Sequence, residues 1–379
     1  MKMAKALSLL IKPASGNCNM RCSYCFYADV TAIRAEGNFG IMSLNTLEKI
    51  VSTALTEAEL FCSFAFQGGE PMLAGLDFFR NLIELEKKHN KQGVKIQYSI
   101  QTNGLLINEE WAAFLSENNF LVGLSIDGEK SIHNTFRKDS LGNGTHSRSL
   151  LAARLLKKHN VDFNILSVVT KQLAAHPDKV WNFYIKQEFY HIQFIPCIES
   201  FEQERGNQLF SLSAEDYGHF LCRIFDLWYD SFCKGTYVSV RAFDNYIQIL
   251  MGNHPENCAM AGVCNAYALV EADGSVYPCD FYAVEEYLLG NVHKSGFNAL
   301  LSSEAVKRFV QPSTKLDQSC IDCAFLQICR GGCRRDREKF KSNELSLNIY
   351  CKSFKMLFVH ALPRMKHIAL SLSGKCIKI

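Results

Sequence analysis

The amino-acid sequence predicts an α/β fold, a partial (β/α)6 TIM-like barrel followed by a cysteine-rich extension. From residue 6 to about residue 195, short apolar runs alternate with amphipathic segments of helical period, which is the pattern of repeated βα units around a parallel sheet. After Ser200 this alternation stops, and from Cys258 onward cysteines and turns replace it. Because 379 residues exceed what one hydrophobic core usually fills, we expect two domains, residues 1–240 and residues 241–379.

The expected strands are short apolar runs, and the expected helices lie between them. The strands span residues 7–11, 61–66, 95–101, 121–126, 162–169 and 191–195. The helices span residues 44–58, 76–89, 108–118, 147–159 and 177–186, with two more at residues 214–234 and 348–370. Ser43 is a suitable N-cap for the first helix because its hydroxyl can accept a bond from a free backbone N–H. Ligands of parallel α/β folds bind beyond the carboxyl ends of the strands, where the polar and glycine-rich motifs fall here.

Composition excludes several classes of protein. The formal net charge is +3, and no basic block is dense enough to form a phosphate-binding stripe, so we expect no nucleic-acid partner. No apolar run approaches the length of a membrane span, and the first ten residues lack the pattern of a secretory signal. Sixteen cysteines in a chain of this size indicate a reducing compartment rather than a disulfide scaffold. We therefore expect a cytoplasmic protein without membrane partners, and a monomer.

Three cysteines follow the first expected strand with the spacing C-x3-C-x2-C: Cys18, Cys22 and Cys25. Three thiolates on one short loop can bind three irons of a 4Fe–4S cubane and leave the fourth iron without a protein ligand. A structural cluster takes four cysteines, and a structural zinc site also closes with four ligands. The spacing therefore predicts an iron–sulfur site that binds something else at its open iron.

A second array contains eight cysteines. Its members are Cys258, Cys264, Cys279, Cys320, Cys323, Cys329, Cys333 and Cys351. Eight thiolates make two four-cysteine sets, which suit either two closed 4Fe–4S clusters or two zinc ions, because soft ligands of this type do not separate the two. The remaining cysteines are isolated, and we expect small buried residues or free thiols at Cys62, Cys197, Cys222, Cys233 and Cys376.

The first motif and the aromatic residue after it resemble the signature of the radical S-adenosylmethionine (SAM) superfamily. That resemblance implies that SAM chelates the open iron and is cleaved by one electron to a 5'-deoxyadenosyl radical. The second array is similar to the SPASM extension of such enzymes. Within that group the chain resembles the anaerobic sulfatase-maturating enzymes from end to end, in the segments at residues 8–13, 25–27, 66–71, 273–282 and 331–335.

The resemblance implies roles for individual residues at the SAM site. Residues that follow the second strand look like the GGE motif that binds the SAM amino group, although a Gly-Gly turn alone is more often structural. One of two arginines would pair with the SAM carboxylate, and Asn134 departs from the usual Asp in the run that ends at the first of them. The implied cofactor-site residues are Tyr27, Gln67, Gly68, Gly69, Glu70, Ser125, Asp127, Arg137, Arg148 and Ile198. Among these, Tyr27 and Gln67 would lie near the substrate and the radical carbon.

The resemblance also implies the cluster sets and the base. One auxiliary 4Fe–4S cluster would take Cys258, Cys264, Cys279 and Cys333, and the other would take Cys320, Cys323, Cys329 and Cys351. Asp280 would be the general base, whereas the sequence alone is equally consistent with a hydrogen-bonded turn residue. The expected cofactors are thus three 4Fe–4S clusters and SAM.

The predicted reaction is oxidation of one cysteine or serine of a sulfatase polypeptide, in a Cys/Ser-x-Pro-x-Arg segment, to Cα-formylglycine. A flavodoxin or ferredoxin would supply the electron. One alternative is a SPASM-type enzyme that forms thioether or carbon–carbon crosslinks in peptides. Another is a non-catalytic multi-cluster electron-transfer protein, which leaves the three-cysteine loop and residues 67–71 unexplained.

Overall fold

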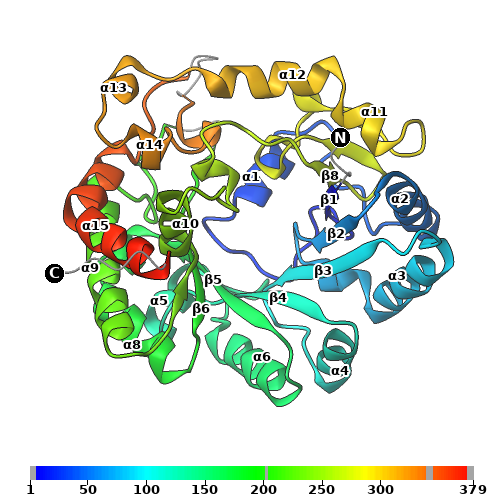
Figure 1. The fold of residues 1–379 in the computed structure, drawn as a ribbon. Helices are drawn as coiled ribbons and strands as arrows, with labels where there is room; N and C mark the ends of the chain where they lie inside the picture. The colour runs from blue at the N-terminus through cyan, green and yellow to red at the C-terminus, as the bar shows by residue number, and fades with distance from the viewer. Residues whose placement is uncertain (1–5, 201–203, 339–344, 374–379) are drawn as a thin grey trace. The chain divides into compact units, whose positions relative to one another are not determined.

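The structure is a computed structural model that describes residues 6–200, 204–338 and 345–373 (Figure 1). The chain forms two compact units, each assembled from three segments. The first unit comprises Met1–Ser125, Arg137–Phe163 and Ala266–Phe309, and the second comprises Ile126–Phe136, Asn164–Asn265 and Val310–Ile379. This division follows compactness and not chain order, so the domain boundary expected at residue 240 stays a prediction.

The first unit contains a parallel sheet of four strands in sequence order. They are β1 (Ala6–Ile11), β2 (Phe61–Phe66), β3 (Lys95–Thr102) and β4 (Phe120–Ser125). Their carboxyl ends lie within two residues of one another in register, since Ile11 pairs with Phe66, and Phe66 pairs with Ile100 near the end of β3. All four expected strands are confirmed to within one residue at each end, and their carboxyl ends meet at one edge of the sheet.

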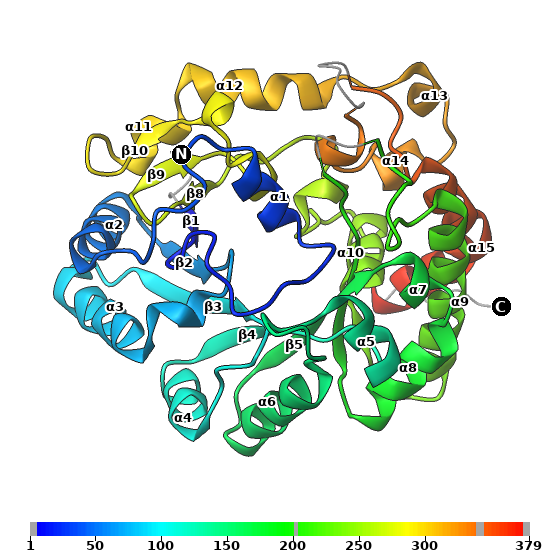
Figure 2. The same cartoon turned by 180° about the vertical axis from the view of Figure 1, so that it is seen from behind.

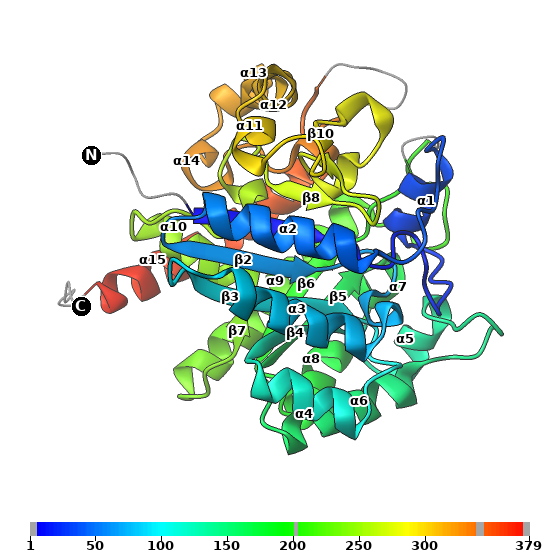
Figure 3. The same cartoon turned by 90° about the vertical axis from the view of Figure 1, so that its right-hand side faces the viewer.

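Helices of the first unit follow the predicted amphipathic segments. They are α2 (Leu44–Glu57), α3 (Leu76–His89), α4 (Glu109–Glu117) and α6 (His146–Lys158). Ser43 caps α2 as expected, because its hydroxyl accepts a bond of 3.1 Å from the backbone N–H of Thr46. Figure 3 shows α2 and α3 side by side along the strands of the sheet. The sequence analysis missed α1 (Phe26–Ala32), a seven-residue helix too short to show a helical period.

A hairpin from the cysteine-rich half of the chain extends this sheet. The strand β8 (Ala268–Val270) pairs in parallel with β1, and β9 (Ser275–Tyr277) pairs antiparallel with β8, followed by β10 (Gly290–Asn291). The chain then forms α11 (Phe297–Leu301) and α12 (Glu304–Val310). Every residue of β8 and β9 is buried, so these strands carry no alternation of apolar and polar residues. The hairpin places residues near position 280 in the same unit as the first cysteine loop.

The second unit contains the parallel strands β5 (Phe163–Val169), β6 (His191–Pro196) and β7 (Ser239–Val240). Its helices are α5 (Lys130–Phe136), α7 (Lys171–Ala174), α8 (Pro177–Lys186), α9 (Ala214–Cys233), α10 (Arg241–Leu250), α13 (Gln318–Ile321), α14 (Leu326–Cys329) and α15 (Cys351–Leu372). The long helices α9 and α15 pack side by side, as Figures 1 and 2 show. Gly218 permits this approach, because a Cβ there would lie 2.6 Å from the sulfur of Met356.

The α/β class with a parallel sheet is therefore confirmed, as are the strands and helices expected up to residue 234. The last helix begins three residues later than expected and ends two residues later. Among the residues that the structure describes, none of the helices is both long enough and apolar enough to cross a bilayer.

Candidate active site

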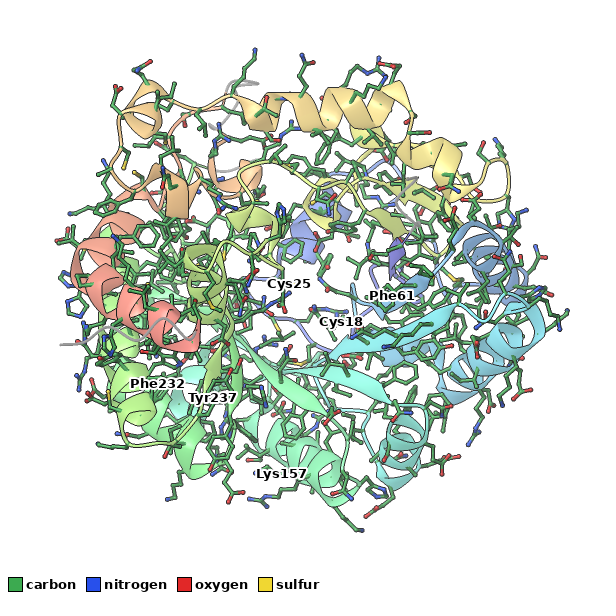
Figure 4. The ribbon with its side chains drawn as sticks, in the orientation of Figure 1. Cys18, Cys25, Phe61, Lys157, Phe232 and Tyr237 are labelled. Carbon is green, nitrogen blue, oxygen red and sulfur yellow. The ribbon has the colours of Figure 1, made fainter. Side chains whose placement is uncertain are left out.

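The loop between β1 and α1 presents the three cysteines of the first motif. It crosses the front of Figure 2 before it enters α1, and Figure 4 labels Cys18 and Cys25 on it. Backbone bonds fix its path, since the N–H of Cys25 donates to the carbonyl of Cys22 at 3.1 Å. The N–H of Met20 donates to the Sγ of Cys18 at 3.4 Å, the kind of bond that stabilises a sulfur carrying negative charge.

The thiols of this loop fit an iron–sulfur group on electrostatic grounds. Burial raises the pKa of the Cys18 thiol to about 11, and the charges of Glu70 and Cys25 act in the same direction. A thiolate at Cys18 therefore needs a positive partner, such as iron, before it can form at neutral pH. Three soft ligands on one loop, with hydrogen-bond donors aimed at sulfur, are suited to a cluster that lacks a fourth protein ligand.

The glycines that follow β2 pack directly against the cysteine loop. Gly69 has a φ of +57°, and a Cβ on it would lie 2.2 Å from the carbonyl oxygen of Asn17. The next N–H, that of Glu70, donates to the same Asn17 oxygen at 2.8 Å. Gly68 has a φ of +93°, and a Cβ there would meet the side-chain carbons of Lys12. The turn thus needs glycine in order to hold the loop of Cys18 in place.

Glu70 turns its carboxylate into the protein. The side chain is buried and accepts bonds from the N–H of Met72 at 3.1 Å, from the hydroxyl of Thr102 at 2.8 Å and from the N–H of Asn103 at 2.8 Å. Burial raises its pKa to about 7, although these three bonds favour the charged form. Glu70 therefore joins the ends of β2 and β3, a role that the sequence analysis did not foresee when it assigned the side chain to an ammonium.

Asp280 lies at the centre of a hydrogen-bonded group in the first unit. Its side chain is only 7% exposed. The Oδ2 atom accepts bonds from the hydroxyl of Tyr27 at 3.0 Å and from the amide of Gln67 at 3.2 Å, and this amide also contacts the Tyr27 oxygen. The Oδ1 atom accepts a bond of 2.5 Å from the hydroxyl of Tyr267. Three residues that the sequence analysis named separately are thus brought together.

Tyr267 was not predicted. It lies three residues after Cys264 in a segment with no recognised motif, so the sequence offers no signal beyond a tyrosine in the cysteine-rich half. Its place opposite Asp280 results from the β8–β9 hairpin, where the N–H of Tyr267 donates to the carbonyl of Pro278 at 3.2 Å.

Three buried charged residues, one of which lies near the Tyr27 ring, were also missed. Lys12, Arg34 and Glu271 form two ion pairs, and the Arg34–Glu271 pair measures 2.5 Å. Burial opposes the charge on Glu271, but the two cations outweigh it and hold its pKa below the usual value. Burial lowers the pKa of Lys12, whose ammonium lies 5.5 Å from the centre of the Tyr27 ring. The cluster joins the segments that follow β1, α1 and β8.

The two arginines considered for the SAM carboxylate have different surroundings. Arg137 is buried, and its guanidinium carbon lies 5.5 Å from the centre of the Tyr24 ring on the cysteine loop. Arg148 is half exposed and forms an ion pair of 2.9 Å with Asp139. Arg137 is therefore the arginine that faces the cysteine loop.

The other residues expected around the SAM nucleoside lie at strand ends. Ser125 is the last residue of β4, and Ile198 lies two residues after β6. Asp127 is buried, its Oδ1 accepts a bond of 2.8 Å from the N–H of Val168, and its own N–H donates to Nδ1 of His133 at 3.2 Å. The structure thus gives Asp127 a part in the local backbone framework.

One of the two expected four-cysteine sets lines a single cavity in the second unit. Its thiols, Cys320, Cys323, Cys329 and Cys351, surround about 310 Å³ of space, part of it open to solvent, with Phe325 and Phe354 in the wall. Burial raises the pKa of the Cys329 thiol to about 11, and the neighbouring cysteines add to the shift.

Four thiols around one space are the soft ligand set expected from the sequence, and ligand type alone suits either a 4Fe–4S cluster or zinc.

The other set is divided between the units. In the second unit, burial raises the pKa of Cys333 well above its usual value, and the charges of Cys258 and Cys264 act in the same direction. Cys279 directly precedes Asp280 in the first unit. Of the isolated cysteines, Cys62 and Cys197 are buried as expected, Cys222 and Cys233 lie on α9, and Cys376 lies outside the described residues.

Comparison with known proteins decides the family. The family model of the Radical SAM superfamily matches residues 13–176, and the family model of the SPASM iron–sulfur cluster-binding domain matches residues 258–324. The cysteine-type anaerobic sulfatase-maturating enzyme of Clostridium novyi (strain NT) is 45% identical over 369 residues, which cover 97% of this chain and 99% of that enzyme. This chain belongs to the anaerobic sulfatase-maturating enzymes.

Further sulfatase-maturating enzymes match over almost their whole length. The serine-type enzyme of Bacteroides thetaiotaomicron is 33% identical, covering 96% of this chain and 91% of that protein. The solved structure of native anSMEcpe with bound AdoMet and Cp18Cys peptide matches with a TM-score of 0.94 at 45% identity, covering 97% of this chain and 100% of that one. The chain is thus a radical SAM oxidoreductase with iron–sulfur clusters, and both alternatives considered from the sequence are set aside.

Proposed function

We propose that this chain oxidises a cysteine side chain in a sulfatase polypeptide to Cα-formylglycine. The observation that carries this proposal is the convergence on Asp280 of Tyr27, from the start of α1 just after the cysteine loop, and Gln67, from the glycine turn. This arrangement supports the proposal, because Asp280 is a buried carboxylate that is hydrogen-bonded to a residue next to the cysteine loop. Cysteine is favoured over serine because identity to the cysteine-type enzyme is 45%, against 33% for the serine-type one.

When bound to Cys18, Cys22 and Cys25, a 4Fe–4S cluster with SAM supplies the radical that removes a hydrogen atom from the substrate Cβ. The chain's own residues manage the proton and the geometry. Asp280 accepts the thiol proton, and one electron leaves the substrate, so that carbon and sulfur form a thioaldehyde. Water then hydrolyses it to the aldehyde and releases hydrogen sulfide.

Tyr27 and Gln67 hold the base in place for this step. Both donate to Oδ2 of Asp280, which leaves Oδ1 with the remaining capacity to accept a proton from substrate. The buried setting excludes bulk water from the carboxylate, which strengthens these interactions and protects a reactive intermediate.

Several residues are assigned to SAM in this proposal. The backbone of Gly68 and Gly69 together with Glu70 forms the wall for the amino group, and Arg137 takes the carboxylate, with Arg148 as the second choice. Ser125 and Asp127 serve the ribose, and Ile198 lines the adenosine pocket. The burial of Arg137 against the cysteine loop supports its assignment.

The auxiliary sites complete the proposal. The two four-cysteine sets would hold two 4Fe–4S clusters, which would supply an acceptor for the second electron, and a flavodoxin or ferredoxin would be the electron donor. The protein works as a cytoplasmic monomer without nucleic-acid or membrane partners. The boundary between its radical SAM domain and its SPASM domain lies near residue 240 of the sequence. The cavity lined by Cys320, Cys323, Cys329 and Cys351 supports one of the two clusters.

One anaerobic assay tests the function. The reconstituted protein is mixed with dithionite, SAM and a peptide that contains Cys-x-Pro-x-Arg or Ser-x-Pro-x-Arg, and the product is weighed by mass spectrometry. We expect the mass of formylglycine, faster from the cysteine peptide. The variant Asp280→Asn should keep its iron and still cleave SAM, but lose aldehyde formation. Formation of 5'-deoxyadenosine with an unchanged peptide in the wild type would contradict the proposal.

A further inference from the structure

The hydroxyl of Tyr267 holds Asp280 at two points. It donates to Oδ1 at 2.5 Å, which is shorter than the bonds from Tyr27 and Gln67 to Oδ2. The same oxygen accepts the backbone N–H of Asp280 at 3.1 Å. A phenol has one proton to give and can accept a bond at the same time, so both contacts are satisfied together. The Sγ of Cys279, at 3.8 Å, is a more distant acceptor for the same proton. One atom therefore fixes both the main chain and the carboxylate of Asp280.

Tyr267 is itself firmly placed. Its N–H donates to the carbonyl of Pro278, and its ring packs against the apolar cluster that includes Val30 and Leu269. The phenol is thus anchored both by a main-chain hydrogen bond and by apolar packing.

The three donors divide the two carboxylate oxygens unequally. Tyr27 and Gln67 fill the two acceptor positions of Oδ2, whereas Tyr267 uses one position of Oδ1. The thiol of Cys279 lies 3.6 Å from Oδ1, but it has no proton to give once it is a cluster ligand. Oδ1 is then the oxygen with an open position.

We propose that Tyr267 is a positioning residue that holds the Asp280 carboxylate in one orientation, so that Oδ1 meets the substrate thiol. This inference rests on the proposed function. Without the hydroxyl, the Asp280 N–H and Oδ1 both lose a partner, and the carboxylate can rotate away from its two donors at Oδ2. A displacement of about 1 Å at a reacting group lowers rates on the order of 10²-fold.

The test compares Tyr267→Phe with Tyr277→Phe in the reconstituted holoenzyme. Tyr277 is a matched control, because it is a buried tyrosine on the same hairpin and no hydrogen bond joins its hydroxyl to Asp280 in the described structure. We expect Tyr267→Phe to lower kcat for formylglycine by about 10- to 100-fold, with the peptide KM changed less than about twofold. SAM cleavage should continue, so that more 5'-deoxyadenosine forms per aldehyde. The control should match the wild type.

Two further measurements separate positioning from loss of structure. In an Asp280→Asn background, Tyr267→Phe should leave iron content and the rate of SAM cleavage unchanged, because Tyr267 acts through Asp280. A crystal structure of Tyr267→Phe should show the carboxylate turned from its wild-type orientation. An unmoved carboxylate in Tyr267→Phe would overturn the inference. An unchanged kcat together with an unchanged ratio of 5'-deoxyadenosine to aldehyde would also overturn it, and so would a fall in SAM cleavage in proportion to lost iron. If the wild type makes no formylglycine, the proposed function fails, and the crystal structure still decides whether Tyr267 orients Asp280.

Discussion

Replacing Gly69 by alanine should disable the enzyme through the cysteine loop. The new Cβ would lie 2.2 Å from the carbonyl oxygen of Asn17, the residue before Cys18. Because real Cβ contacts below 3.0 Å essentially do not occur, the turn and the loop must separate by about 0.8 Å. Both sides of this contact are backbone, so no flexible side chain can absorb the shift, and the bond from the N–H of Glu70 to Asn17 is strained at the same time.

The expected loss of stability in Gly69→Ala has two contributions, one from backbone conformation and one from the steric clash. An alanine at a φ of +57° costs about 1 kcal/mol relative to glycine, and the steric clash adds about 1–3 kcal/mol. Gly93→Ala is the matched control, because Gly93 has a φ of +67° and a Cβ there would have nothing within 4 Å. Gly93→Ala should therefore lose only the stability that an alanine at positive φ costs, without the steric clash.

The assay measures iron per chain, melting temperature and the rate of formylglycine formation under anaerobic conditions. We expect Gly93→Ala to melt slightly lower and to retain wild-type activity. Gly69→Ala should lose activity by about 100-fold or more, because the site that binds the cluster is displaced. Wild-type iron content and activity in Gly69→Ala would refute the idea that this glycine holds the loop of Cys18.

Three other predictions concern buried charge, pH and the auxiliary cavity. Glu271→Gln leaves two buried cations without an anion and should lower the free energy of unfolding by about 3–5 kcal/mol. Lys12→Met should lower it less, as measured by thermal unfolding of the holoenzyme. Equal effects of the two variants would contradict the ion-pair argument. Burial raises the pKa of Glu70 to about 7, so its contribution to the free energy of unfolding is full below about pH 4.5 and falls by about 3 kcal/mol as the pH rises through 7. Glu70→Gln should therefore flatten the dependence of melting temperature on pH in this window. Parallel curves for variant and wild type would disprove the assignment. Cys351→Ala should lose about four irons per chain whereas Cys222→Ala loses none, and equal iron contents would rule out the assigned set.

The sequence by itself determined the features that are encoded over short stretches. The strands and helices expected up to residue 234 follow from local periodicity, and the structure reproduces their ends to within one residue, whereas the short helices α1, α5 and α7 were not expected. The cysteine motifs are contiguous spacings, so Cys18, Cys22 and Cys25 could be read as one site without any fold. Asp280 was found because it is adjacent to Cys279. The family was also recognisable from such segments.

Only the tertiary structure decided which distant residues meet. Lys12 and Glu271 are 259 positions apart, and Tyr27 and Asp280 are 253 apart, yet each pair is in contact. These contacts depend on the pairing of β8 with β1, and a fully buried three-residue strand carries no pattern that specifies its partner or register. For the same reason Tyr267 gave no signal, and the carboxylate of Glu70 could not be assigned to Thr102 and Asn103. Periodicity encodes which face of an element is buried, whereas strand pairing selects what that face meets.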